Sequence, residues 1–312
     1  MPTEALLERR LVFLTGKGGT GRSTLAQALA ASAAARGRRT LLVELAGARL
    51  QSSAQPEQRR PDGADATGSD QAAPGERPGA FERASIDPDR TLVDWLAALG
   101  GRLPARMLAA RASFRFFAAA APGARELLSL VRILELCSGE SGEAYATVIV
   151  DGPASGHARA LLRAPATYAA IARVGPIAAR AAEVQALLTD RARSALVAVA
   201  RPSEMAVTET IELAHGLRHD LGRSLDAVLV NGVLDERFSA AEIARLRRLE
   251  GPHPTAAALH AAALAHARTV REHHQIARLR KARLSAHELP YLFSSQIGAE
   301  ELSLLGAALA DL

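Results

Sequence analysis

A short stretch near the start of the chain combines glycines, cations and hydroxyls at a spacing that suits phosphate chemistry. The apolar run 11–14 leads into a loop with glycines at positions 16, 18, 19 and 21, and an alanine-rich segment follows. Glycines let the backbone curl with its N–H groups pointing inward, and the start of a helix adds partial positive charge at that point. We therefore expect this loop to bind a polyanion.

The loop satisfies two ligand patterns at once. The first is the dinucleotide pattern G-x-G-x-x-G of Gly16, Gly18 and Gly21, supported by Glu44 near the end of the next expected strand. The second is the nucleoside-triphosphate pattern between Gly16 and Gly21, in which Arg22 stands where lysine is usual. The glycines alone do not separate the two patterns.

The side chains around the glycines favour the triphosphate. Lys17 and Arg22 are cations, and Ser23 and Thr24 are hydroxyls at the first turn of the expected helix. A dinucleotide pyrophosphate needs none of these groups, whereas a triphosphate with Mg²⁺ uses all of them. The residues predicted to surround the phosphates are Gly18, Gly19, Thr20, Gly21, Arg22, Ser23 and Thr24.

Two further strands are expected to end in polar residues. The β-prone run 147–150 places Asp151 at the carboxyl end of a buried parallel strand, where ligands of such sheets bind. In a nucleotide site this aspartate holds a Mg²⁺-bound water, and the turn 152–156 can move with the γ-phosphate. The alternative is an ordinary strand end that Asp151 caps. The strand 227–231 ends in Asn231, whose amide carries the donor and acceptor that recognise the edge of adenine.

A sheet is needed to bring these strand ends together. Strands are predicted over 11–14, 40–45, 83–86, 147–150, 195–200 and 227–231, and helices over 22–35, 207–221, 239–286 and 299–312. The strand, helix and strand between 11 and 45 form one right-handed parallel unit. The expected fold class is α/β, a doubly wound and mostly parallel sheet with an inserted helical lobe.

We expect one domain over residues 1–312. Its segment 51–79, rich in Gln, Ser, Pro, Gly, Asp and Arg, is predicted to be a mobile low-complexity loop because it buries too little surface to order itself. The segment 91–136 is predicted to be the inserted helical lobe, because apolar residues recur there at helical spacing. Those residues form either the core of the lobe or an apolar groove for a client helix.

Composition narrows the partners and the compartment. The net charge of +5 is spread along the 312 residues without a dense basic patch, so no nucleic-acid partner is expected. The single cysteine excludes an intramolecular disulfide and fits a reducing compartment. Residues 1–10 carry both charge signs and no long apolar window occurs. We therefore expect a cytoplasmic protein with neither a signal peptide nor a transmembrane segment.

Taken in order, the motifs resemble those of the arsenite-translocating and tail-anchored-protein-targeting ATPases, the ArsA-like deviant P-loop family related to MinD-type ATPases. The resemblance covers nearly the whole chain except 51–79. It is carried by the loop 16–24 and by 151–157, which is similar to the family's switch II. It implies a P-loop NTPase fold, ATP with Mg²⁺, and a nucleotide-switched homodimer that handles a hydrophobic protein client or a membrane-associated partner.

The resemblance also implies roles for individual residues. Lys17 would reach across the dimer to the nucleotide of the partner, and Ser23 would ligate Mg²⁺ beside Asp151. The remaining contacts with the nucleotide would come from Glu204, Asn231 and Pro290, the last of these beside the adenine.

The chain departs from the family pattern at two positions. Arg22 replaces the lysine that grips the β- and γ-phosphates, which keeps the charge but changes its shape and reach. Ala46 stands where the family's switch I carries the aspartate that positions the attacking water, and Glu44 lies two residues back on the same side of the strand. Hydrolysis is therefore expected to be slow or to rest on Glu44, with Lys17, Arg22 and Asp151 as the other catalytic candidates.

Two other functions stay open at this point. The first is an ATP-dependent scaffold or chaperone that hydrolyses ATP very slowly or not at all, which the residues at positions 22 and 46 favour. The second is a dinucleotide-dependent oxidoreductase, which only the G-x-G-x-x-G pattern and Glu44 support.

Overall fold

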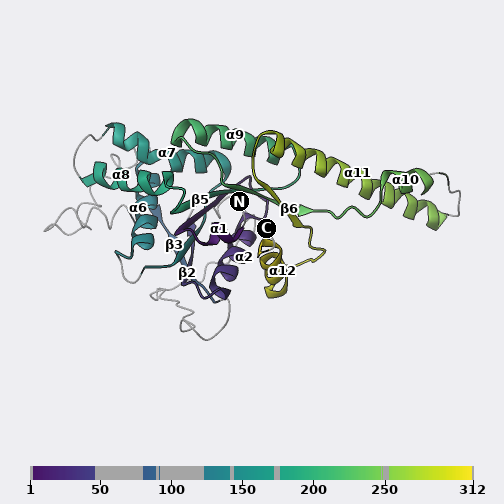
Figure 1. Cartoon of the computed structure of the whole chain (residues 1–312), viewed down its shortest axis with the longest axis horizontal. Helices are drawn as coiled ribbons and strands as arrows, with labels where there is room; N and C mark the ends of the chain where they lie inside the picture. Colours follow the sequence, from purple (N-terminus) through teal and green to yellow (C-terminus); the bar gives the residue numbers. More distant parts are fainter. Residues whose placement is uncertain are drawn as a thin grey trace, which may run out of the picture.

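The computed structural model describes residues 3–45, 80–88, 91, 123–140, 144–171, 176–246, 248 and 253–310. Ala46, the predicted loop 51–79 and residues 92–122 of the predicted helical lobe lie outside this part of the chain. Within it, seven strands form one sheet in the order β3-β2-β4-β1-β5-β6-β7 (Figure 1). Every pair of neighbouring strands is parallel, so the predicted α/β fold class is confirmed.

The strands are β1 (Leu11–Thr15), β2 (Thr40–Leu45), β3 (Glu82–Ile86), β4 (Thr147–Asp151), β5 (Ser194–Ala200), β6 (Ala227–Val233) and β7 (Ala286–Pro290). The central strands β1, β4 and β5 are buried along their whole length. Parallel strands covered on both faces read as continuous apolar runs, which is why the sequence predicted these three well. The edge strand β3 is mostly exposed.

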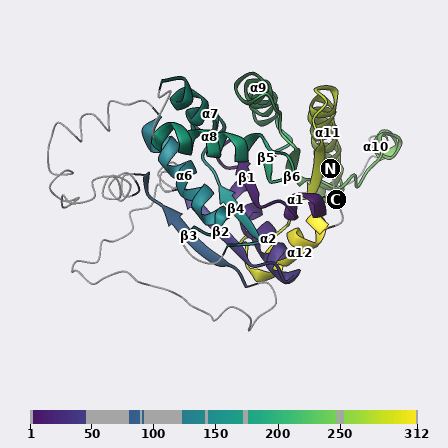
Figure 2. The same ribbon diagram turned by 60° about the vertical axis from the view of Figure 1, so that its left-hand side comes forward.

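Helices cover both faces of the sheet (Figure 2). One face carries α1 (Thr3–Leu7), α2 (Arg22–Ala35) and α12 (Ala299–Ala310), whose buried side chains form a core with alternate residues of the strands. The other face carries α6 (Ala124–Ser138), α7 (Ser155–Ile171), α8 (Pro176–Thr189), α9 (Glu204–Leu221) and part of α11 (His253–Lys281). Although α6 falls within the predicted lobe, it packs on β4, α7 and α8 as part of this layer.

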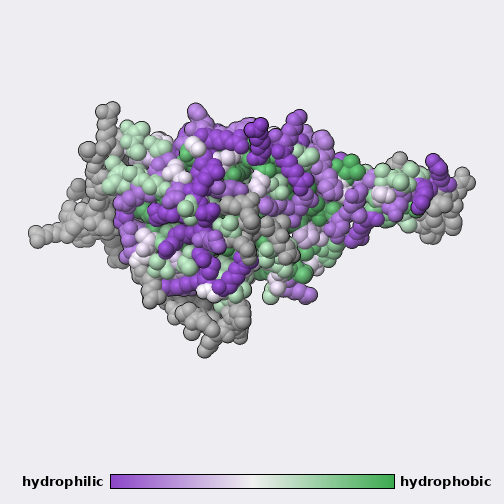
Figure 3. Space-filling model, in the orientation of Figure 1, coloured by the Kyte–Doolittle hydropathy of each residue, from purple (hydrophilic) through white to green (hydrophobic). Residues whose placement is uncertain are grey.

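The long helix α11 forms an arm on one side of the molecule. Its 29 residues span about 43 Å, and it extends beyond the sheet with the short helix α10 (Ala240–Leu246) beside it (Figure 1). No helix in the described ranges is long and apolar enough to cross a membrane. Hydrophilic and hydrophobic side chains are interspersed over the visible face, the arm included (Figure 3).

The structure differs from the sequence predictions at two places near the ends of the described chain. A helix was predicted over 239–286, but the last helix of this segment ends at Lys281. Residues 286–290 form the edge strand β7. Only Leu289 of β7 is fully buried, so the strand lacks the apolar pattern that would have revealed it. The short helix α1 was also not predicted, although Leu6 and Leu7 are buried in the core of the α2 face.

Candidate functional site

The glycine loop connects β1 to α2, and its backbone requires glycine at both ends. Gly16 has a φ of 151°, and a Cβ there would lie 2.1 Å from a main-chain oxygen of β5. Gly21 has a φ of 87°, and a Cβ there would lie 2.2 Å from Nδ2 of Asn231 on β6. By contrast, a Cβ at Gly18 or Gly19 would meet no described atom within 4 Å. The loop is therefore tightly packed at its ends and open in the middle, where a ligand can approach.

Asp151 receives both side chains that begin α2. Arg22 donates through Nε to Oδ1 at 2.6 Å, and Ser23 donates through Oγ to Oδ2 at 2.5 Å. Arg22 also donates to the main-chain oxygen of Gly16 at 3.3 Å. The Arg22 and Asp151 side chains are only 11% and 9% exposed, so this is a largely desolvated ion pair. The structure thus brings together Ser23 and Asp151, the two residues predicted to hold Mg²⁺. Arg22 neutralises the charge of the Asp151 carboxylate.

The second cation of the loop contacts a different carboxylate. Lys17 forms an ion pair with Glu209 on α9, and Thr20 donates through Oγ1 to the main-chain oxygen of Lys17 at 2.8 Å. The other oxygen of Glu209 accepts a hydrogen bond from Ser155, the first residue of α7, at 3.2 Å. One glutamate therefore joins the loop after β1 to the helix after β4.

The turn after Asp151 is tied to the end of β1. Gly152 donates its main-chain N–H to the carbonyl oxygen of Leu14 at 3.0 Å. Thr15 donates through Oγ1 to the carbonyl oxygen of Pro153 at 2.9 Å. The segment that the sequence identifies as a switch thus begins in direct contact with the strand that enters the glycine loop.

The three residues predicted at the far end of the nucleotide lie in different settings. Asn231 donates through Nδ2 to the main-chain oxygen of Thr20 at 2.9 Å, so its amide supports the glycine loop in this structure. Pro290, the last residue of β7, lies opposite Val233 of β6. Asn231 lies on β6 close to Val233. Glu204 is exposed at the first turn of α9. Base recognition by these residues stays a prediction.

Glu44 lies on β2 directly opposite Asp151 on β4. Successive side chains on a strand point to opposite faces, so residues two positions apart share a face. Glu44 is two positions from Leu42 and Asp151 is two positions from Ile149, and both of these apolar residues lie in the core on the α2 face. Both carboxylates therefore project to the side of the sheet that carries α2. The predicted water-positioning residue, Glu44, is one strand spacing, about 4.8 Å, from the strand of Asp151.

Thr24, the other hydroxyl predicted near the phosphates, lies beside Ser23 on the first turn of α2.

These residues fit a triphosphate with Mg²⁺. A hydroxyl oxygen of Ser23 and the carboxylate of Asp151 are in contact beside open loop backbone and the start of α2. Among the described residues, no group of three or more His, Cys, Asp or Glu forms a separate metal site. Mg²⁺ typically takes one or two protein oxygens and fills its other positions with phosphate oxygens and water, which matches this donor set.

Sequence reasoning missed Glu209. The residue lies 192 positions from Lys17, inside a helix whose sequence gives no chemical motif. It reaches the loop because β5 is the direct neighbour of β1, which brings α9 over the end of β1. Only the strand order could have revealed this contact.

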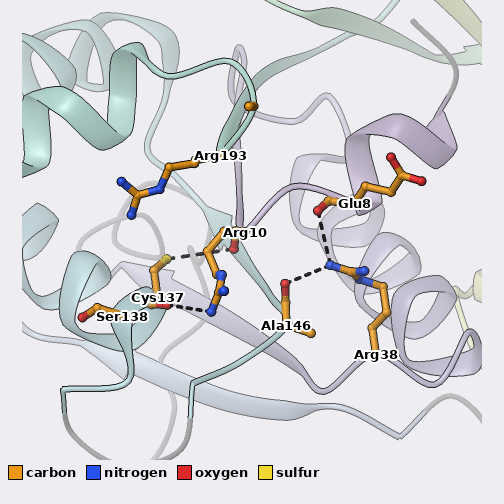
Figure 4. A pocket seen from close by; sticks show the side chains of 8 residues that line it. Glu8, Arg10, Arg38, Cys137, Ser138, Ala146 and Arg193 are labelled. Atoms are coloured by element: carbon orange, nitrogen blue, oxygen red, sulfur yellow. Dashed lines mark hydrogen bonds between the residues drawn. The ribbon is translucent and has the colours of Figure 1, made fainter.

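A hollow of about 470 Å³ lies at the opposite end of the sheet, where the strands begin (Figure 4). Two arginines that line the hollow donate hydrogen bonds to main-chain carbonyls. Arg10 donates to the carbonyl of Cys137 at 3.1 Å, and Arg38 donates to that of Ala146 at 2.9 Å. Burial raises the pKa of the Cys137 thiol to about 12, outweighing the opposite effect of Arg10 and Arg193. These hydrogen bonds hold the strand ends together, and the buried Cys137 thiol is not reactive.

The strand order separates the two ligand patterns of the loop. β4 lies between β1 and β2, so the strand that ends in Asp151 is the direct neighbour of the strand that enters the loop. In the dinucleotide-binding fold the first strand pairs with the second instead. This order, together with the contact of Ser23 and Asp151, defines an α/β fold of the P-loop NTPase class.

Comparison with known proteins agrees with this class. Residues 9–52 match the family described as anion-transporting ATPase. ATPase BagA of Mycobacterium tuberculosis is 29% identical over 251 residues, which cover 76% of this chain and 68% of BagA. A protein of Mycobacterium bovis matches with the same identity and coverage. These similarities support the resemblance to the ArsA-like P-loop ATPases that the motifs indicated.

Proposed function

We propose that this chain is a nucleotide-switched ATPase that binds ATP with Mg²⁺ at the glycine loop. The observation that carries the proposal is the contact of Ser23 and Asp151 at the start of α2, beside loop backbone that is open at Gly18 and Gly19. A hydroxyl and a carboxylate next to a phosphate cradle are the protein groups that Mg²⁺ and a triphosphate need. Similarity to the family of anion-transporting ATPases over residues 9–52 supports the same nucleotide.

Each part of the loop has a role in this proposal. Main-chain N–H groups from Gly18 to Thr24 surround the phosphates, and Arg22 contacts the phosphates bound to its own subunit. Ser23 and Asp151 would hold Mg²⁺, which would neutralise the charge of the phosphates. The far end of the nucleotide is bordered by Glu204, Asn231 and Pro290.

Hydrolysis requires a group that positions the attacking water, and we assign this role to Glu44. Its support is its place opposite Asp151 on the same side of the sheet as α2. A carboxylate there can accept a proton from water. The ion pair of Arg22 and Asp151 has to rearrange before either group serves a ligand, so turnover is slow in this proposal.

The active species is proposed to be a homodimer in which Lys17 contacts the nucleotide of the partner subunit. The nucleotide state of this dimer acts on a hydrophobic protein client or a membrane-associated partner. The support for a client is the apolar residues at helical spacing between 92 and 117, because those further along lie in α6, which packs in the core. A cytoplasmic location is part of the same proposal.

A second candidate is an ATP-dependent scaffold or chaperone that hydrolyses ATP very slowly or not at all. The ion pair of Arg22 and Asp151 favours it, because the two groups that would serve the triphosphate already satisfy each other. The third hypothesis, a dinucleotide-dependent oxidoreductase, is disfavoured by the position of β4 between β1 and β2.

Binding and turnover measured on the same sample separate these functions. Thermal unfolding with ATP–Mg²⁺ or with NAD identifies the ligand, since a ligand that binds the folded chain raises Tm. The ATPase predicts stabilisation by ATP–Mg²⁺ together with phosphate release that Asp151→Asn abolishes. Stabilisation by ATP without phosphate release supports the scaffold. Stabilisation by NAD alone contradicts both.

A further inference from the structure

Glu209 lies near the contact between the helices that follow the two neighbouring strands of β1. β4 and β5 flank β1, and the helices that follow them, α7 and α9, pack against each other. From α9, Glu209 binds Lys17 with one carboxylate oxygen and accepts a hydrogen bond from Ser155 of α7 with the other. The loop, the first turn of α7 and α9 therefore share a single carboxylate.

The two cations of the loop are held on opposite sides of the sheet. Arg22 is paired with Asp151 on the side of α2, whereas Lys17 is paired with Glu209 on the side of α9. The exposures differ as well, because Lys17 and Glu209 are 35% and 32% exposed. Both side chains are about one-third exposed, so water competes for both charges and the ion pair is easily broken. Lys17 is thus the cation that a strongly charged ligand can draw away at least cost.

We propose that Glu209 is a positioning residue that competes with the phosphates of the nucleotide for Lys17. A triphosphate carries several negative charges and displaces the single carboxylate of Glu209 from the ammonium group. When Lys17 leaves, the charge balance at Glu209 changes, and so does its hydrogen bond with Ser155. In the proposed dimer, the occupancy of the partner's loop is thereby transmitted to the start of α7. This inference rests on the proposed function, because it requires a dimer with a triphosphate at the loop of the partner subunit.

The chain offers an internal reference for a direct test. Lys17 and Lys281 are its two lysines, and Lys281 is exposed at the end of α11. Amine acylation read by mass spectrometry gives the ratio of labelling at the two sites. We expect Glu209→Gln to raise the Lys17 to Lys281 ratio several-fold without nucleotide, because the amide carries no charge to hold the ammonium group.

The matched control is Glu212→Gln. Glu212 is an exposed residue three positions further along α9, so this change removes the same charge from the same helix. It is expected to leave the labelling ratio at the wild-type value. A ratio that Glu209→Gln leaves unchanged, or that both variants raise equally, overturns the proposal.

A non-hydrolysable ATP analogue with Mg²⁺ tests the competition itself. We expect it to protect Lys17 from labelling in Glu209→Gln, and to bind this variant several-fold more tightly than the wild type. Binding that Glu209→Gln leaves unchanged or weakens overturns the competition alone. No binding of the analogue to the wild-type chain overturns the proposed function, and the competition with it.

Hydrogen exchange at the start of α7 tests the second link. The analogue is expected to change the exchange rates of main-chain amides over 155–158 in the wild type. Ser155→Ala removes the hydroxyl that contacts Glu209, so it should reduce this response while Lys17 labelling stays close to the wild-type value. A full response in Ser155→Ala overturns the coupling to α7.

Discussion

Arg22 binds the carboxylate of Asp151 in a nearly buried ion pair, with Nε and Oδ1 2.6 Å apart. Ser23 completes the contact from the same turn of α2. Removing one partner of such a pair leaves an uncompensated charge, so neither group is freely available. The proposed binding of a nucleotide at this loop would replace one set of charged partners by another, and this exchange is the reason why we propose slow turnover.

The charge of Arg22 is expected to matter more than its shape for nucleotide binding. Arg22→Ala removes a cation that contacts phosphates, and it should weaken ATP–Mg²⁺ binding about tenfold to a hundredfold. Arg22→Lys keeps the charge, so its affinity should stay within a few-fold of the wild type. Calorimetric titration measures both variants. An equal loss of affinity in the two would contradict this assignment of the charge.

Glu44 is expected to affect turnover and leave binding intact. Glu44→Gln keeps the size of the side chain but cannot accept the proton of the attacking water, so phosphate release should fall on the order of 10²-fold. The affinity for ATP should be unchanged, which separates kcat from KM. Glu212→Gln, on the far side of the sheet, serves as the control. Weaker ATP binding with normal turnover would show that Glu44 has only a structural role.

Lys17 should matter for turnover more than for binding to one subunit. In the proposed dimer this lysine acts on the partner's phosphates, as a cation supplied in trans does, so Lys17→Ala should lower turnover on the order of 10³-fold. ATP binding to the isolated subunit should remain largely intact. Light scattering of the wild type with an ATP analogue and Mg²⁺ should show a dimer, and finding only monomer would be incompatible with this role.

One ion pair between α7 and α9 predicts how stability depends on pH. Arg159 donates to Asp220 at 2.7 Å, and this hydrogen bond holds the pKa of Asp220 below its ordinary value of 3.8. A carboxyl group whose folded pKa is lowered stabilises the fold above its unfolded pKa, and this stabilisation is lost as pH falls through the folded pKa.

The variant Arg159→Met removes that pair and keeps an aliphatic side chain over Gly216. It should therefore lower the free energy of unfolding at neutral pH, and its difference from the wild type should shrink as pH falls below 3.8. Arg218→Met, an exposed change in the last turn of α9, should show no such dependence. Denaturant unfolding at several pH values measures this. A difference that is constant with pH would refute the role of Asp220.

The sequence identified the parts of the site that lie next to each other along the chain. Apolar runs long enough for buried strands, each followed by glycine or a polar residue, located the loop, Asp151 and Asn231. The structure brings Ser23 into contact with Asp151, and these are the two residues that the resemblance assigned to Mg²⁺. Those signals are local, because a buried parallel strand and a glycine turn each leave their own composition.

Contacts that depend on strand order could not be predicted in this way. Glu209 reaches Lys17 only because β5 neighbours β1, and no local pattern marks it. The amide of Asn231 supports the main chain of Thr20, although its chemistry alone suggested base recognition. The edge strand β7 escaped prediction because only Leu289 of it is fully buried, so the apolar pattern of a buried strand is missing.

The dependence of ATP binding on Mg²⁺ directly tests whether Asp151 belongs to a site for Mg²⁺ and ATP. Equilibrium ATP binding is measured with Mg²⁺ and with a chelator for the wild type, Asp151→Asn and Asp190→Asn, the last a control at the opposite end of the sheet. We expect Mg²⁺ to tighten ATP binding to the wild type and to Asp190→Asn, and Asp151→Asn to raise the Mg²⁺ requirement about tenfold to a hundredfold. No ATP binding, or the same Mg²⁺ dependence in all three proteins, would contradict it.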